Sequence, residues 1–281
     1  MTRTKIVVDS ASDLSQEMID QMQVPVQRVP LTIRVDGQPY VDDEELDVEQ
    51  TLRRMEASPG WGQTAAPAPE AFLQAYGDAD EVFAVTLSSK LSNGTYNAAM
   101  AAKQMLDEAI TGVKVHVFDS LSASVGEALL ALKIAELARL RLPFQEIVDS
   151  MNQFIKQTKT YILLERYDVL AKTGRMNPAI AKLASFLNIK PICQEVEGTI
   201  ALMEKVRGYG KAMARLVDII AGEKIDWTSR LLAVSHIKCL DRALTLRDEL
   251  VKRLPDIRVL ITEASGIIAL YGCRGGLVVS F

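Results

Sequence analysis

Short β-branched runs alternate with longer stretches of helical periodicity between residues 82 and 140. The runs at residues 82–87 and 114–118 are typical of buried strands, and residues 96–106 and 128–140 are typical of helices. Parallel neighbouring strands need a crossover connection, which is usually a helix. With the β-branched run at residues 5–8, the sequence therefore predicts an α/β domain built on a mainly parallel sheet that helices flank.

The chain beyond residue 160 repeats this alternation with a different texture. An apolar run at residues 161–164 precedes helical segments on both sides of Arg175, and a hairpin is predicted across Glu197-Gly198. Helices at residues 210–221 and 240–254 and strands at residues 231–236 and 257–261 follow. Because 281 residues correspond to about two domains, we predict two α/β domains, residues 1–160 and 161–281.

Two further patterns lie within the first 70 residues. Residues 31–35 and 38–41 flank Asp36-Gly37, a dipeptide that tolerates positive φ and predicts a tight hairpin. Residues 58–69 contain three prolines and two glycines, so we expect a long loop without regular structure there.

Composition excludes several classes of protein. The chain carries 32 basic and 36 acidic residues with interspersed signs, whereas a nucleic-acid-binding protein needs a basic surface, so we expect no nucleic-acid partner. No apolar run approaches the roughly 18 residues that span a bilayer, and the N-terminus lacks the apolar stretch of a secretory signal. Three scattered cysteines cannot close a full disulfide framework. The sequence therefore predicts a cytoplasmic protein without an integral membrane segment.

Familiar catalytic and metal-binding motifs are absent from the sequence. It contains no P-loop, no G-x-G-x-x-G and no G-x-S-x-G pattern. The two histidines, His116 and His236, have no cysteine or carboxylate at ligand spacing, so no metal site is expected.

Small hydroxyl-bearing residues gather where the predicted strands of the first domain end. They are Ser10 and Ser12, the stretch Ser88-Ser89-Lys90-Leu91-Ser92-Asn93-Gly94-Thr95, and Ser120, Ser122 and Ser124; Thr64 adds a further hydroxyl from the proline-rich segment. Such residues cap helices routinely, and the same positions can also bind an anion at a helix N-terminus. Both interpretations stay open from the residues alone.

Five segments together resemble the DegV family of bacterial fatty-acid-binding proteins in their order and spacing. They are Asp9-Ser10-Ala11-Ser12-Asp13-Leu14, Thr64-Ala65-Ala66-Pro67, Ser88 to Thr95 followed by Tyr96, Asp119-Ser120 with Ser124-x-Gly126, and Lys172-Thr173-Gly174-Arg175. The resemblance implies a DegV-like fold of two α/β domains that buries one long-chain fatty acid. It also implies that the carboxylate is presented to a fatty-acid kinase subunit, which forms an acyl phosphate for phospholipid synthesis.

The resemblance assigns roles to three residues. The hydroxyl groups of Thr64 and Ser92 match those that bind the carboxylate in the family, and Arg175 matches an arginine of the surface used for the kinase. Replacing Arg175 is therefore expected to weaken kinase coupling and to leave lipid binding intact. The chain would be a lipid-binding subunit without catalytic turnover of its own, and with no cofactor other than the bound fatty acid.

The sequence departs from the family pattern around this expected head-group site. Ala65 stands where a serine usually follows the threonine, and the extra residue Asn93 can shift Ser92 or pass its role to Thr95. The family's C-terminal histidine is missing. In its place Tyr271 can donate a hydroxyl group, or Arg274 can pair with the anion. Alternatively, the carboxylate is held less tightly or another head group binds.

The remaining expectations concern the neighbouring loops, the acyl chain and an alternative function. Ser10, Asn93, Gly94, Ser120 and Ser122 are expected in loops beside the head group. Ile180, Leu183, Ala184 and Leu187 are candidates for the lining of an aliphatic tunnel, although helical spacing of apolar residues implies only a buried face. The alternative is an enzyme acting on a small phosphorylated or carbonyl substrate, with His236 or Ser92 as the nucleophile.

Overall fold

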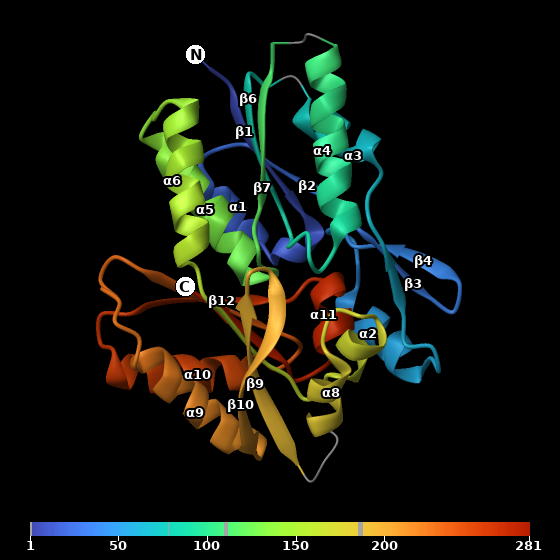
Figure 1. Ribbon diagram of the computed structural model, residues 1–281, viewed down its shortest axis with the longest axis vertical. Helices are drawn as coiled ribbons and strands as arrows, with labels where there is room; N and C mark the ends of the chain where they lie inside the picture. Colours follow the sequence, from blue (N-terminus) through green and yellow to red (C-terminus); the bar gives the residue numbers. More distant parts are fainter. Residues whose placement is uncertain (1, 78, 110–111, 185–187) are drawn as a thin grey trace.

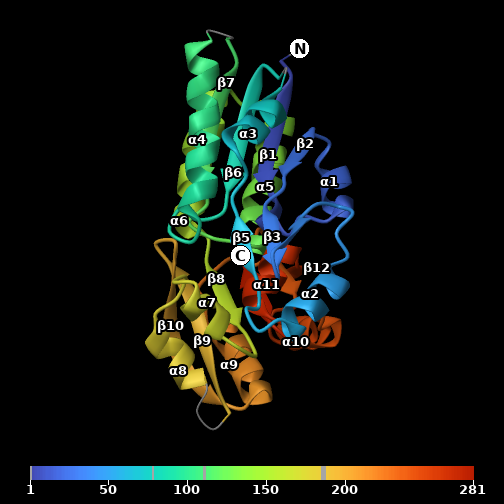
Figure 2. The same ribbon diagram turned by 90° about the vertical axis from the view of Figure 1, so that its right-hand side faces the viewer.

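The computed structural model describes residues 2–77, 79–109, 112–184 and 188–281. Its strands form a four-stranded, a six-stranded and a three-stranded sheet. Figures 1 and 2 show the two larger sheets in two lobes stacked along the long axis, with the C-terminus between them. No helix in the described part of the chain is long and apolar enough to cross a membrane.

The four-stranded sheet is parallel throughout, which confirms the prediction for the first half of the chain. Its strands, in the spatial order β2-β1-β6-β7, are β1 (Thr4–Asp9), β2 (Val26–Val29), β6 (Glu81–Thr86) and β7 (Lys114–Asp119). Alternate residues of β1 face opposite layers: Ile6 and Val8 pack on one face and Val7 packs on the other.

Helices cover both faces of this sheet. The face that includes Val7 packs against α3 (Pro69–Tyr76) and α4 (Asn93–Glu108), and the other face packs against α1 (Gln16–Met22), α5 (Val125–Arg139) and α6 (Phe144–Gln157). The helices α4 and α5 begin three residues before the predicted positions, because the short polar residues of the preceding loops continue into their first turns. The carboxyl ends of all four strands point toward the second lobe (Figure 1).

The three-stranded sheet corrects one expectation. It consists of β3 (Thr32–Val35), β4 (Gln38–Val41) and β5 (Gln63–Ala65), and α2 (Val48–Ala57) follows β4. The predicted hairpin turns at Asp36-Gly37, both with positive φ. The expectation that residues 58–69 lack regular structure was wrong: their prolines and glycines flank Gln63–Ala65, which pairs with β3 and places Thr64 opposite Ile33.

The six-stranded sheet has the order β10-β9-β8-β13-β11-β12. Its strands are β8 (Thr160–Leu163), β9 (Ile189–Val196), β10 (Thr199–Arg207), β11 (Leu231–His236), β12 (Arg258–Glu263) and β13 (Leu277–Ser280). The predicted hairpin of β9 and β10 is confirmed. The first strand of this sheet begins at Thr160, one residue before the predicted second domain. The domain boundary itself stays a prediction.

Two long helices cover the face of the six-stranded sheet that lies away from the first lobe. The helices α9 (Tyr209–Ala221) and α10 (Leu240–Arg253) pack with Tyr161, Leu163 and Val279. The residues that alternate with these, including Ile162 and Val278, face the first lobe and join a second apolar cluster. The short helices α7 (Asp168–Lys172), α8 (Pro178–Ala184) and α11 (Gly266–Gly272) lie at this side.

Two buried carboxyl groups fix α11 between the lobes. Asp42, after β4, accepts hydrogen bonds from the backbone N–H groups of Gly266 and Ile267 at 2.8 and 3.2 Å. Asp13 accepts one from the N–H of Ser265 at 2.7 Å and others from the hydroxyl groups of Ser124 and Ser235. These contacts satisfy backbone donors at the start of α11 and hold the two lobes in one arrangement.

Candidate functional site

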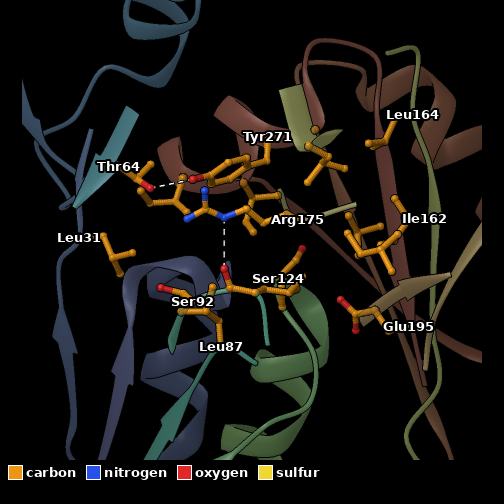
Figure 3. Close-up of a pocket in the computed structure, with 18 residues that line it drawn as sticks. Leu31, Thr64, Leu87, Ser92, Ser124, Ile162, Leu164, Arg175, Glu195 and Tyr271 are labelled. Carbon is orange, nitrogen blue, oxygen red and sulfur yellow. Dashed lines mark hydrogen bonds between the residues drawn. The ribbon is translucent and has the colours of Figure 1, made fainter. Parts of the chain in front are cut away.

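A pocket lies where the loops of the parallel sheet meet the face of the six-stranded sheet that carries Ile162 and Val278 (Figure 3). Most of its lining is aliphatic: Leu31, Leu87, Leu91, Ala123, Ile162, Leu164, Leu170, Ile200, Ile267, Ile268 and Val278. The polar side chains among the described lining residues are those of Thr64, Ser92, Ser124, Arg175, Glu195 and Tyr271. An apolar pocket with a few converging polar groups is the usual form of a small-molecule site.

Thr64 and Tyr271 meet at one side of the pocket. Their hydroxyl oxygens lie 2.7 Å apart in a hydrogen bond in which either group can be the donor (Figure 3). The register of β5 on β3 positions Thr64, and Tyr271 comes from α11. Trp61 strengthens the same junction, because its indole N–H donates to the carbonyl of Leu270 at 2.7 Å. Of the two residues suggested for the missing histidine, the structure thus brings Tyr271 to Thr64.

Ser92 and Thr95 lie beside this pair at the start of α4. Ser92 is the N-cap residue, yet its hydroxyl makes no capping bond and pairs instead with the hydroxyl of Thr95 at 2.9 Å. Asn93 and Gly94 belong to the first turn of the helix and not to a loop. A Cβ atom on Gly94 would lie only 3.1 Å from the Cβ of Ala66, so glycine lets α4 approach the segment that carries Thr64.

Arg175 lies in the pocket lining, although the sequence assigned it to a partner surface. Its guanidinium donates to the carbonyls of Leu91 and Thr173 at 3.2 and 2.9 Å. It also lies 5.2 Å from the centre of the Tyr271 ring, within the range of a cation–π interaction. Figure 3 shows it between the Thr64–Tyr271 pair and Ser92. Arg175 is the one cationic side chain among the described residues of the lining.

Arg274 does not reach this group, because it is held on the outer surface. Its guanidinium pairs with Glu49 at 3.0 Å and with Glu56 at 3.2 Å, both on α2. The hydrogen bond from Arg274 and a second one from Arg53 lower the pKa of Glu49 to about 2. The chain leaves α11 at Cys273 with a φ of 57°, and this turn directs Arg274 toward α2, away from Tyr271.

The other hydroxyl residues of the strand-end loops are mostly structural. The hydroxyl of Ser10 accepts a hydrogen bond from the N–H of Leu31 at 3.1 Å. The hydroxyl of Ser120 donates to the carbonyl of Ser122 and accepts from the N–H of the same residue. Ser122 contacts Thr160 and Glu195 through its hydroxyl group. A Cβ on Gly126 would lie 1.9 Å from the Ser122 hydroxyl, which explains why a glycine stands two residues after Ser124.

Ser124 and Glu195 line the pocket at its other side, and the sequence did not single out Glu195. Figure 3 shows Glu195 pointing into the pocket, well separated from the Thr64–Tyr271 pair. Burial raises the pKa of its carboxyl group to about 8. Period-two alternation in β9 carries a signal for this position, because Glu195 shares a strand face with Cys193, which is fully buried.

The structure describes only two of the four predicted tunnel side chains, those of Ile180 and Ala184. Ile180 and Ala184 pack in the same apolar cluster as Ile162 and Leu170, but they are not among the residues that line the pocket. The side chain of Leu183 and the whole of Leu187 lie outside the described residues. These positions remain candidates for contact with a longer ligand.

Neither histidine lies at the pocket within the described part of the chain. His236, at the end of β11, is 6% exposed, and burial lowers its pKa. The ring of His116 lies tilted against that of Phe118, with 4.5 Å between the ring centres. The hydroxyl of Ser92, the other suggested nucleophile, pairs with that of Thr95, and no basic side chain among the described residues accepts its proton. No group of three or more potential metal ligands occurs among the described residues.

Comparisons with known proteins find relatives over nearly the whole chain. The family model described as "Uncharacterised protein, DegV family" matches residues 3–280. A DegV domain-containing protein of Streptococcus pyogenes serotype M1 is 31% identical over 278 residues, which are 99% of this chain and 98% of that protein.

Solved structures match the fold over its whole length. A DegV family protein of Ruminococcus gnavus, described with vaccenic acid, has a TM-score of 0.91 at 33% identity and covers 100% of this chain and 99% of its own. The Fatty Acid Kinase (Fak) B3 protein of Streptococcus pneumoniae, loaded with linoleic acid, has a TM-score of 0.89 at 30% identity with the same coverage. The predicted α/β fold is thereby confirmed.

Proposed function

The chain belongs to the DegV family, and from that premise we propose that it binds a long-chain fatty acid and presents its carboxylate to a fatty-acid kinase. The observation that carries the proposal is an aliphatic pocket with paired hydroxyl groups and one cation gathered at one side. Relatives of the same fold are described with vaccenic and linoleic acids, and one of them is a fatty-acid kinase B protein.

The aliphatic lining supplies the affinity. A tail of about 14 methylenes at ~0.8 kcal/mol each offers roughly 11 kcal/mol of burial before the costs of ordering the ligand are subtracted. Leucine, isoleucine and valine side chains from both lobes provide the matching surface. The polar groups therefore serve mainly to orient the molecule.

The carboxylate is expected at Thr64, Ser92, Tyr271 and Arg175. Thr64 and Tyr271 have one hydroxyl proton each, and the hydrogen bond between them uses only one of the two. The other O–H can therefore point toward an anion. Arg175 adds a positive charge at the same side. At the other side the pocket has the carboxyl group of Glu195 and no cationic side chain among the described lining residues. A second carboxyl group beside it would be disfavoured, so we do not expect the head group there.

Neutral hydroxyl groups suit a carrier that hands its ligand to another protein. They hold a carboxylate while leaving one oxygen able to attack a phosphoryl group, whereas a buried arginine clamp would neutralise both oxygens. The guanidinium of Arg175 is already engaged by two backbone carbonyls and is only half-buried. We assign the phosphorylation chemistry to the partner kinase, in the cytoplasm, and to this chain the binding and the orientation of the fatty acid.

Mass spectrometry of the denatured, purified protein tests the proposal. We expect long-chain fatty acids in the extract. We also expect the emptied protein to bind such acids again, one molecule of fatty acid per molecule of protein. A folded protein that is empty and cannot be loaded with any long-chain acid would contradict it. Acyl phosphate formation on adding a fatty-acid kinase and ATP then tests the partner role separately.

A further inference from the structure

A second hollow lies between the lobes, on the flank away from the head-group residues. It is a groove with a volume of about 700 Å³, between α5 and α6 of the first lobe and the loop that joins α9 to β11 in the second. Figure 1 shows α5 and α6 at one flank of the molecule and α11, which carries Tyr271, toward the other. None of the described residues that line the groove lines the acyl pocket, so the two hollows are separate.

The floor of the groove is apolar and comes from both lobes. Leu129 and Leu132 of α5, Phe154 of α6 and Leu231 of β11 line it. All four belong to the same apolar cluster as the wall of the acyl pocket. Leu129 is buried, whereas the other three are partly exposed. An apolar surface that opens to water in this way favours contact with an apolar ligand.

Three cations stand around this floor: Lys224, Arg230 and Arg258. No carboxyl group of a described residue pairs with any of them. Arg230 is half-buried, with its guanidinium 5.3 Å from the centre of the Phe154 ring and one hydrogen bond, at 3.4 Å, to the side-chain oxygen of Gln157. Burial lowers the pKa of Arg230, because no nearby carboxylate offsets the lost hydration. A guanidinium in this position gains from an anion.

The acidic residues of the groove are already used by their own elements. Glu136 pairs with Lys133 at 3.0 Å, one helical turn away on α5. The carboxylate of Asp226 accepts hydrogen bonds from the backbone N–H and the hydroxyl of Thr228 at 3.1 and 2.6 Å. The three cations of the groove are therefore left for an anion from outside the chain.

The head-group side of the acyl pocket shows the same pairing of a guanidinium with an aromatic ring. There Arg175 lies 5.2 Å from the centre of the Tyr271 ring, beside the aliphatic lining. In the groove Arg230 lies over Phe154, beside leucines of the same apolar cluster. Both places set a cation at the edge of an apolar surface, and this combination matches a molecule with an anionic head and an apolar chain.

We propose that the groove is a second binding site, for a single acyl chain with an anionic head group that Arg230 binds. A carboxylate and a phosphate share the required chemistry, because each accepts two parallel N–H donors from a guanidinium. The inference rests on the proposed function for the kind of chain and adds a site that is used while the acyl pocket is full. Since the groove is open to water, it buries less of a chain than the pocket and exchanges its ligand more readily.

Calorimetric titration of the protein saturated with stearic acid tests the proposal. The probes are decanoic acid, decyl phosphate, 1-decanol and decyltrimethylammonium, each below its micellar concentration, together with inorganic phosphate. At least one of the two ten-carbon anions should bind with one equivalent, and the preferred one identifies the head group. Decanol, the ammonium compound and inorganic phosphate should bind at least tenfold more weakly, since each lacks the charge or the chain. Mass spectrometry after the titration checks that stearic acid stays bound.

Variants of the cations assign the binding to the groove. Arg230→Met keeps the aliphatic stem and should weaken binding of the ten-carbon anion about tenfold or more, with stearic acid binding within about twofold of the unaltered protein. Arg258→Met removes an exposed charge at the rim and should weaken it about threefold. Lys156→Met is the matched control: Lys156 is an exposed cation in the last turn of α6 that does not line the groove, and its loss should have less than a twofold effect.

The outcomes separate this site from the proposed function. If the saturated protein binds no second equivalent, if decanol binds as tightly as the anions, or if a folded Arg230→Met variant binds them unchanged, the inference is wrong and the fatty-acid pocket stands. If the protein does not retain stearic acid, the proposed function is wrong, and the same probes are titrated into the empty protein. Anion binding that Arg230→Met removes there still supports the groove, and binding that it leaves unchanged overturns it.

Discussion

The two polar sides of the pocket use the same kinds of side chain for different purposes. At the outer side, Thr64, Ser92 and Tyr271 are half-buried and bond mainly to other hydroxyl groups, so their protons can be redirected to a ligand. At the inner side, Ser124 is 1% exposed and its proton is committed to the buried carboxyl group of Asp13. A hydroxyl group therefore binds a ligand or holds the fold according to the partner that already uses its proton.

Charge separates the two sides as well. Arg175 makes the outer side attractive to an anion, whereas Asp13, Glu127 and Glu195 make the inner side unfavourable for one. Because an isolated charge is costly in a low-dielectric interior, we expect the carboxylate of a fatty acid to lie at the outer side.

Removing the carboxyl group of Asp13 should lower the stability of the folded protein strongly. Asp13→Ala leaves the hydroxyls of Ser124 and Ser235 and the N–H of Ser265 without their acceptor. At about 1 kcal/mol or more for each, we expect a loss of about 3 kcal/mol in the free energy of unfolding, measured by urea denaturation. The control Asp20→Ala alters an exposed residue of α1 and should change stability by less than about 0.5 kcal/mol. Equal effects of the two variants would contradict the structural role of the inner side.

Stability should fall as the pH rises from 5.5 to 8.5. Burial raises the pKa of Asp9 to about 7, that of Asp42 to about 6 and that of Glu195 to about 8. The folded state then keeps protons that the unfolded chain has released, so this stabilisation is complete below about pH 4 and is lost as the pH passes the folded-state values. We expect a decrease of about 2 kcal/mol or more across this range.

The Glu195 contribution to this pH dependence can be isolated. Glu195→Gln should flatten the decrease above about pH 7, because the amide does not ionise. Thermal melting at intervals of half a pH unit provides the measurement. A curve that rises toward pH 8.5, or one that E195Q leaves unchanged, would show that these carboxyl groups are ionised in the folded protein.

Removing the positive charge at the outer side should weaken fatty-acid binding. Arg175→Met keeps much of the aliphatic stem but loses the guanidinium beside Tyr271. We expect Kd to rise about tenfold, which corresponds to one charge-assisted hydrogen bond in a half-buried site. This differs from the expectation drawn from the sequence, which limited Arg175 to kinase coupling.

Lys172→Met is the matched control for Arg175. Lys172 is an exposed cation at the end of α7, near Arg175 in sequence, and it pairs with Asp168 at 3.5 Å. Its replacement should leave Kd within about twofold. If the Arg175 variant binds fatty acids with unchanged affinity, Arg175 does not contact the ligand and acts only at the surface for the partner.

The hydroxyl pair at the outer side should give a smaller, coupled effect. Thr64→Val and Tyr271→Phe each remove one hydroxyl at nearly constant shape, and each should raise Kd by about fivefold. Because the two groups share one hydrogen bond, the double variant should lose less than the sum of the two single losses. Additive losses measured by calorimetry would mean that Thr64 and Tyr271 contact the ligand independently.

The sequence predicted the elements that local chemistry determines. β-Branched runs located the parallel strands, and Asp36-Gly37 located its hairpin because both residues adopt positive φ. The family resemblance selected Thr64 and Ser92, and side-chain chemistry suggested Tyr271 or Arg274 in place of the missing histidine. The fold brings Thr64, Ser92 and Tyr271 to one pocket, and their contact with a ligand stays a prediction.

Residues whose positions depend on distant partners escaped prediction. β5 is a strand because it pairs with β3 through backbone hydrogen bonds. No propensity within residues 58–69 indicates that pairing. Arg274 follows Tyr271 by three residues, yet the turn at Cys273 sends it to Glu49 and Glu56. Alternation in β9 marks the face of Glu195, but only the packing of the two lobes shows that a pocket lies over that face.

A crystal structure of the protein with a bound fatty acid would locate the carboxylate and the acyl chain directly. We predict that the carboxylate lies within hydrogen-bond distance of Thr64, Ser92 or Tyr271, with Arg175 nearby, and that the acyl chain runs between the lobes past Glu195. A carboxylate found beside Glu195, or a fatty acid bound only outside this pocket, would contradict it.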